Sequence, residues 1–95
     1  MKYVSDGKIY DTESSTALAV HFYQDDDGLT FEETLYLSPA GNLFRVMTWK
    51  CEDGLDRAEL ATLDEKSATH WLSTNSVKVL SDKLITLPGI NLEFA

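Results

Sequence analysis

Two apolar segments separated by a turn sequence constrain the fold more than any other feature of the chain. The segments are Phe31–Leu37 and Leu43–Trp49, and Ser-Pro-Ala-Gly-Asn occupies positions 38–42 between them. Pro39 fixes the φ angle that the second position of a type I turn needs, and Gly41 can adopt the left-handed φ that follows. The spacing predicts a β-hairpin whose three-residue loop ends in a glycine bulge.

Pairing of Ser38 with Asn42 fixes the register of this hairpin. One face then carries the opposed pairs Tyr36 with Phe44 and Thr34 with Val46. The other face carries Leu37 with Leu43, Glu33 with Met47, and Phe31 with Trp49. Because both faces carry apolar side chains, we expect helices on one face. Another part of the chain, a second copy or a partner would cover the other.

The segment before the hairpin predicts a short hairpin and a helix. Asp6-Gly7 between the apolar pairs at 3–4 and 9–10 is typical of a tight turn, or of a turn that leads into one strand. A helix over about 13–23 is predicted, with Asp11 or Thr12 as its N-cap. Four of its side chains share one side at helical spacing: Ala17, Leu18, His21 and Phe22.

The segment after the hairpin predicts a third strand over about 57–62 and a second helix. Asp64 is the expected N-cap, with a capping box of Thr62 and Glu65 as the alternative. The helix runs to about Thr74, with Trp71 as its anchor on the sheet and Asn75 as a left-handed stop.

The last twenty residues allow two interpretations. Apolar positions between 77 and 87 repeat at helical spacing, which favours a helix, and two short strands are the alternative. Residues 90–94 alternate between apolar and polar, which fits a terminal strand or an apolar tail that docks elsewhere. Altogether we expect one α+β domain over residues 1–95. It would have a three- to four-stranded antiparallel sheet with two or three helices packed on it.

The charge of the chain disfavours several partners. Sixteen acidic residues against eight basic ones give a formal net charge of −8. Nucleic-acid binding needs clustered lysine and arginine, and an anionic membrane surface would repel this chain, so neither is an expected direct partner. The charge serves either solubility alone or binding to a basic surface. With one cysteine, no apolar leader and no membrane-length apolar run, a cytoplasmic location in a host cell is expected.

No motif for catalysis, a cofactor or a metal is recognisable. Around Gly28, the first and last positions of a calcium loop would be Tyr23 and Thr34, which excludes an EF-hand. A looser cation site would use Asp25, Asp27 and Glu32. His21, His70 and Cys51 lack the flanking residues of a zinc or nucleophile site. We therefore expect a protein that is not an enzyme, without cofactor or metal.

The placement of the acids suggests a binding site. Residues 25–33 contain five acids and no base, and residues 52–65 contain six acids with only Arg57 in opposition. Folding of the hairpin brings both segments toward the sheet end opposite the Pro39–Gly41 turn. The candidate partner-binding residues are Asp25, Asp26, Asp27, Glu32, Glu33, Glu52, Asp53 and Asp56.

Four short motifs in fixed order resemble a family of small acidic proteins carried by phages and mobile elements. They are Tyr-Asp-Thr-Glu at 10–13, Glu-Thr-Leu-Tyr at 33–36, Gly-Asn-Leu-Phe at 41–44, and Leu-Asp-Glu-Lys-Ser-Ala at 63–68 with Trp71-Leu72. The resemblance extends from about Lys8 to Leu72. It implies an accessory protein of a mobile element, a group that includes inhibitors of bacterial defence systems such as anti-CRISPR proteins.

Charge and resemblance together predict a non-enzymatic inhibitor of the anti-CRISPR type. It would bind a host defence protein or ribonucleoprotein complex on a basic surface that handles nucleic acid. The alternative is a small regulatory or self-associating module, a possible homodimer, without nucleic-acid mimicry. Its interface would be the second hairpin face, formed by Phe31, Leu35, Leu37, Met47 and Trp49.

Overall fold

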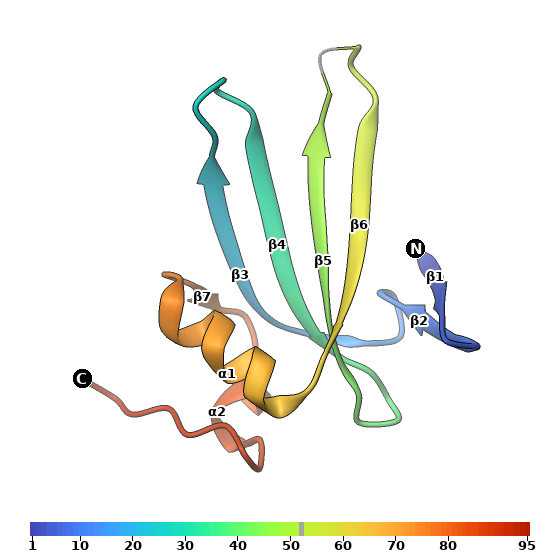
Figure 1. Ribbon diagram of the computed structural model, residues 1–95. Helices are drawn as coiled ribbons and strands as arrows, with labels where there is room; N and C mark the ends of the chain where they lie inside the picture. The colour runs from blue at the N-terminus through green and yellow to red at the C-terminus, as the bar shows by residue number, and fades with distance from the viewer. Residues whose placement is uncertain (52) are drawn as a thin grey trace.

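The computed structural model describes residues 1–51 and 53–95 and is mostly β (Figure 1). A two-stranded sheet pairs β1 (Lys2–Ser5) with β2 (Lys8–Asp11). A five-stranded antiparallel sheet has the order β6-β5-β4-β3-β7. Its strands are β3 (Thr16–Gln24), β4 (Thr30–Leu37), β5 (Leu43–Lys50), β6 (Asp56–Leu63) and β7 (Lys78–Val79). The helices are α1 (Glu65–Thr74) and the single turn α2 (Lys83–Thr86). Neither is long and apolar enough to cross a membrane.

The predicted α+β class with two or three helices is wrong. Helices make up about 15% of the chain, and α1 alone exceeds one turn. The error begins with the helix predicted over 13–23, which is instead strand β3. A β-bulge between Ala17 and Ala19 buries Leu18 and Ala19 in succession. Consecutive buried residues imitate the helical pattern, because a regular strand alternates between its faces.

The predicted central hairpin is confirmed as β4 and β5, and its register is the expected one. Tyr36 lies opposite Phe44, and Phe31 lies opposite Trp49. The Ser38 amide donates to the Asn42 carbonyl at 2.8 Å, which closes the turn. Gly41 has a φ of 90°, the left-handed value that the bulge requires.

Three other predicted elements are present with small changes. The hairpin at Asp6-Gly7 is β1–β2, the third strand is β6, and α1 begins after the N-cap Asp64. Asp11 caps a turn rather than a helix: its Oδ1 accepts from the Glu13 amide at 3.1 Å. The left-handed stop predicted at Asn75 is wrong, since that residue is extended with a φ of −129°.

The C-terminal segment is neither the favoured long helix nor a terminal strand. Residues 78–79 pair with β3, and only residues 83–86 are helical. Residues 90–94 form no strand, but Ile90 is buried in the core, as expected for a tail that docks elsewhere.

The five-stranded sheet has a core on each face. On the helix face, α1, α2 and Ile90 pack over Leu18, Leu35 and Leu43. On the opposite face, the β1–β2 hairpin packs Tyr10 against Phe44, with ring centroids 5.2 Å apart. The face that carries Tyr36 and Phe44 is thus covered by another part of the same chain, one of the coverings expected.

The far half of the sheet extends beyond the helices. Figure 1 shows the β3–β4 and β5–β6 hairpins projecting together past α1. The molecule is correspondingly flat, with extents of 41 × 36 × 19 Å. This projecting half carries the acidic turns predicted as a binding site.

Candidate protein-interaction site

The β3–β4 turn (residues 25–29) and the described residues of the β5–β6 turn (51 and 53–55) lie at the same end of the sheet (Figure 1). This is the end opposite the Pro39–Gly41 turn, as the hairpin topology predicts. The two turns line one open depression of about 640 Å³, formed by Asp25, Asp27, Gly28, Leu29, Cys51, Asp53 and Arg57. We call the group Asp25, Asp26, Asp27, Asp53 and Asp56 the acidic end.

The first turn is organised by Asp25. Its Oδ1 accepts from the amides of Asp27 at 3.0 Å and of Leu29 at 2.8 Å. The Asp25 amide in turn donates to the Leu29 carbonyl at 3.0 Å. Asp25 therefore shapes the turn, and this shape presents the exposed Asp26 and Asp27 to solvent.

The second turn uses Asp53 in the same way. Its Oδ1 accepts from the Leu55 amide at 2.9 Å, and its Oδ2 lies 3.3 Å from the Arg57 guanidinium. Asp56 is exposed at the start of β6, opposite Lys50. Glu52, the remaining candidate of this segment, lies outside the described residues.

The two glutamates of β4 point to opposite faces of the sheet. Glu32 is exposed and lies between Phe22 of β3 and Thr48 of β5 on the face opposite the helices. Glu33 is 7% exposed and lies on the helix face. Its Oε2 accepts from Trp71 Nε1 at 3.3 Å and is 3.2 Å from Arg45 Nη1. Glu33 is therefore separated from the acidic end and connects the sheet to α1.

An aromatic row lies on the helix face; the sequence predicts its Phe31–Trp49 pair, but not Tyr23, which the predicted helix over 13–23 misplaced. Tyr23, Phe31 and Trp49 stand side by side on adjacent strands, with ring centroids 4.9 Å and 5.7 Å apart. Partial burial, and next the Glu33 carboxylate, raise the pKa of the Tyr23 phenol above its usual value. The alternation of Ala19, His21 and Tyr23 would have revealed β3 had the bulge not disguised it.

The five residues predicted as a self-association interface lie in two different parts of the sheet. Leu35 is fully buried and Leu37 is half-buried against the helix-face core. Phe31, Met47 and Trp49 remain partly exposed in the projecting half. The five residues therefore do not form one continuous open surface.

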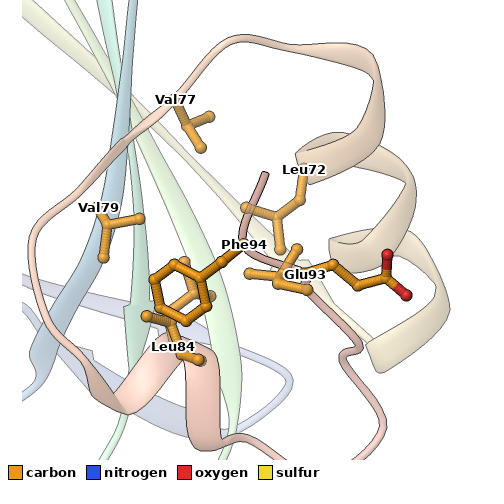
Figure 2. A pocket seen from close by; sticks show the side chains of 8 residues that line it. Leu72, Val77, Val79, Leu84, Glu93 and Phe94 are labelled. Carbon is orange, nitrogen blue, oxygen red and sulfur yellow. The ribbon is translucent and has the colours of Figure 1, made fainter.

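An apolar pocket lies away from the acidic end. Figure 2 shows Leu72, Val77, Val79 and Leu84 around it, with Phe94 of the C-terminal tail at its edge. Its volume is about 260 Å³, and Glu93 is its single charged lining residue. None of the predicted partner-binding residues that the structure describes lines it.

The chemistry available at the acidic end is that of hydrogen-bond acceptors. Ionised carboxylates accept from lysine, arginine and amide donors and cannot donate. Within residues 1–51 and 53–95, no three or more His, Cys, Asp or Glu side chains gather closely enough to hold a metal ion.

Comparisons with protein-family models, with curated proteins and with solved structures give no significant match.

Proposed function

We propose that this chain is a binding protein that inhibits a bacterial defence complex of the host cytoplasm. In this proposal it is an anti-CRISPR type of inhibitor whose acidic end occupies a basic surface that otherwise holds nucleic acid. The observation that carries the proposal is the joining of two acidic turns, distant in sequence, along one depression.

The electrostatics of the acidic end support this role. Asp26, Asp27 and Asp56 are exposed, on a chain whose net charge is −8. Carboxylates exposed at one end of a sheet attract a basic cleft from a distance and compete there with phosphate groups. Because these charges face solvent, salt screens their attraction over about 10 Å at 0.1 M. Binding should therefore weaken as the salt concentration rises.

A charge-reversal variant tests the proposal in hosts that carry CRISPR defence systems of different types. Asp26→Lys/Asp27→Lys/Asp56→Lys changes three exposed acids and spares Asp25 and Asp53, which hold the turns. We expect the wild-type chain to restore plasmid transformation against at least one system. The variant should lose this protection.

The matched control is Glu13→Lys/Asp82→Lys/Glu93→Lys, which makes the same change in net charge at exposed positions outside the acidic end. It should protect like the wild type. Equal loss in both variants would assign the effect to total charge. Undiminished protection by the first variant would contradict a role for the acidic end.

A further inference from the structure

Strand β6 leaves one edge of the five-stranded sheet open. It is the last strand in the order β6-β5-β4-β3-β7, and no strand of the described residues pairs with its outer side. The Cys51 amide donates to the Leu55 carbonyl, so Leu55 faces β5. Hydrogen-bonding direction alternates along a strand. Residues 57, 59, 61 and 63 therefore bond to β5, whereas residues 56, 58, 60 and 62 direct their N–H and C=O groups outward.

The backbone of this edge has neither a proline nor a bulge to block pairing, although β6 carries three charged side chains, Asp56, Arg57 and Glu59. β6 contains no proline, and it pairs with β5 from Asp56 to Leu63 without a register shift. The opposite edge is different, because β3 contains a bulge and is partly covered by β7. A long regular edge is a template for another strand, and bulges, proline or covering segments normally prevent such pairing.

We propose that β6 pairs with β6 of a second copy of this chain, antiparallel and centred on Ala58. This goes beyond the proposed function, which does not depend on it. The two sheets join into one of ten strands. The two acidic ends then point in opposite directions, because the symmetry axis reverses the strand direction.

The charge pattern of β6 selects this register among the symmetric ones. Residues directly opposite each other must point to the same face of the joined sheet. The twofold axis therefore lies midway between one residue and the same residue of the other copy. With Ala58 at the axis, Arg57 of each copy lies opposite Glu59 of the other. This gives two pairs of opposite charge on the helix face.

The neighbouring registers lack this complementarity. An axis at Glu59 places two glutamates directly opposite each other, which is destabilising. An axis at Leu60 places Arg57 opposite Leu63 and leaves the charges without a cross-strand partner. Arg57 and Glu59 therefore favour self-pairing centred on Ala58 over self-pairing centred on Glu59 or Leu60.

The Ala58 register also places backbone groups correctly. Ala58 lies opposite Ala58, and Asp56 lies opposite Leu60 on each side, all residues with outward-directed N–H and C=O groups. These three pairs form about six hydrogen bonds, two for each pair. The Arg57 and Glu59 pairs are of the non-hydrogen-bonded kind, in which the side chains approach most closely. A single-strand interface of this size is small, so the association is expected to be weak and reversible.

Sedimentation equilibrium over about a hundredfold range of protein concentration tests the pairing. We expect a monomer–dimer equilibrium for the wild type. Arg57→Glu or Glu59→Arg alone places like charges opposite each other twice and should weaken the dimer on the order of tenfold. The double exchange Arg57→Glu/Glu59→Arg restores opposite charges and should recover most of the affinity. Lys83→Glu and Glu93→Arg are the matched reversals away from β6.

A backbone variant gives an independent test. Ala58→Pro removes an N–H that points away from β5, so the β5–β6 ladder keeps its bonds while the dimer axis loses two. It should be monomeric with an unchanged circular dichroism spectrum. If the Ala58→Pro variant does not fold, the charge exchange at positions 57 and 59 still tests whether β6 pairs with β6 of a second copy. A wild-type monomer at every concentration, or a dimer indifferent to the exchange at 57 and 59, would overturn the proposal.

Discussion

Glu33 shows how one side chain of an acidic segment acquires a structural role. Its neighbour Glu32 is exposed, whereas Glu33 points under α1 and accepts from both Trp71 and Arg45. Trp71 is 5% exposed, so its indole N–H depends on this acceptor. Among the described residues, no buried side-chain nitrogen or oxygen lacks a hydrogen-bond partner. Glu33 therefore satisfies a polar group that the packing of α1 buries.

Removing this carboxylate should destabilise the fold. Glu33→Ala leaves the Trp71 indole N–H and the Arg45 guanidinium without their acceptor. Leaving a buried donor unsatisfied costs about 1–3 kcal/mol. The Arg45 side chain is 29% exposed, so water recovers part of the loss and the lower end of that range is expected. Urea unfolding followed by tryptophan fluorescence measures the change.

Glu32→Ala is the control for this prediction. It removes the same chemical group one residue earlier, from an exposed position on the opposite face. Such surface changes usually alter stability by less than about 0.5 kcal/mol. If both variants unfold at the same urea concentration, the assignment of Glu33 as a buried structural acceptor is contradicted.

At the scale of the element, α1 depends on its first turn. The Asp64 carboxylate accepts from the Ser67 amide at 2.7 Å. The backbone hydrogen bond from Ser67, followed by its side-chain hydroxyl, lowers the pKa of Asp64. The folded state therefore binds the proton of this group less tightly than the unfolded chain does.

This shift predicts a pH dependence with a definite sign. The stabilisation from the charged cap is complete above the unfolded pKa of about 3.9 and is lost as the pH falls through the lower folded pKa. Asp64→Asn keeps a good capping side chain that does not titrate. The difference in melting temperature between wild type and Asp64→Asn should shrink or invert between about pH 5 and pH 2. A difference that stays constant over this range would contradict the role of the ionised cap.

Elements defined by local chemistry could be predicted from the sequence, and elements defined by distant contacts could not. The turn at Pro39-Ala40-Gly41 fixes the register of β4 and β5 within a few residues, so both strands were found with their pairs. Asp64 marks the start of α1 by its own side chain. β3 differs because its bulge hides the alternation of its two faces, and because the partner on its outer side, residues 78–79, lies far along the chain.

The short segments near the C-terminus follow the same rule. Lys78-Val79 is extended because it pairs with Ala19 and Val20, nearly sixty residues earlier in the chain. The amides of Leu80 and Ser81 then donate to the Leu18 carbonyl at the bulge. The alternative of two short strands is therefore correct for residues 78–79 and wrong for residues 83–86, which are helical. The sequence allowed the first strand but did not indicate its partner, and the helical spacing of the leucines favoured the wrong alternative.

At the scale of the whole molecule, the topology of two long hairpins determines what the acids can do. The placement of the turns followed from the sequence, because an antiparallel pair returns the chain to the end from which it began. The burial of Glu33 under α1 could not be predicted from the sequence, because it depends on which face of β4 packs against α1. The depression between the turns likewise depends on β3, whose strand character was hidden by the bulge.

The two turns of the acidic end should act as one binding surface. Titration of the isotope-labelled chain with a short arginine-rich peptide, followed by amide chemical-shift changes, tests this. We expect the amides of residues 25–29 and 53–57 to shift together, with a single apparent affinity that falls as salt is added. Shifts confined to one turn, different affinities for the two turns, or shifts centred elsewhere on the chain would contradict it.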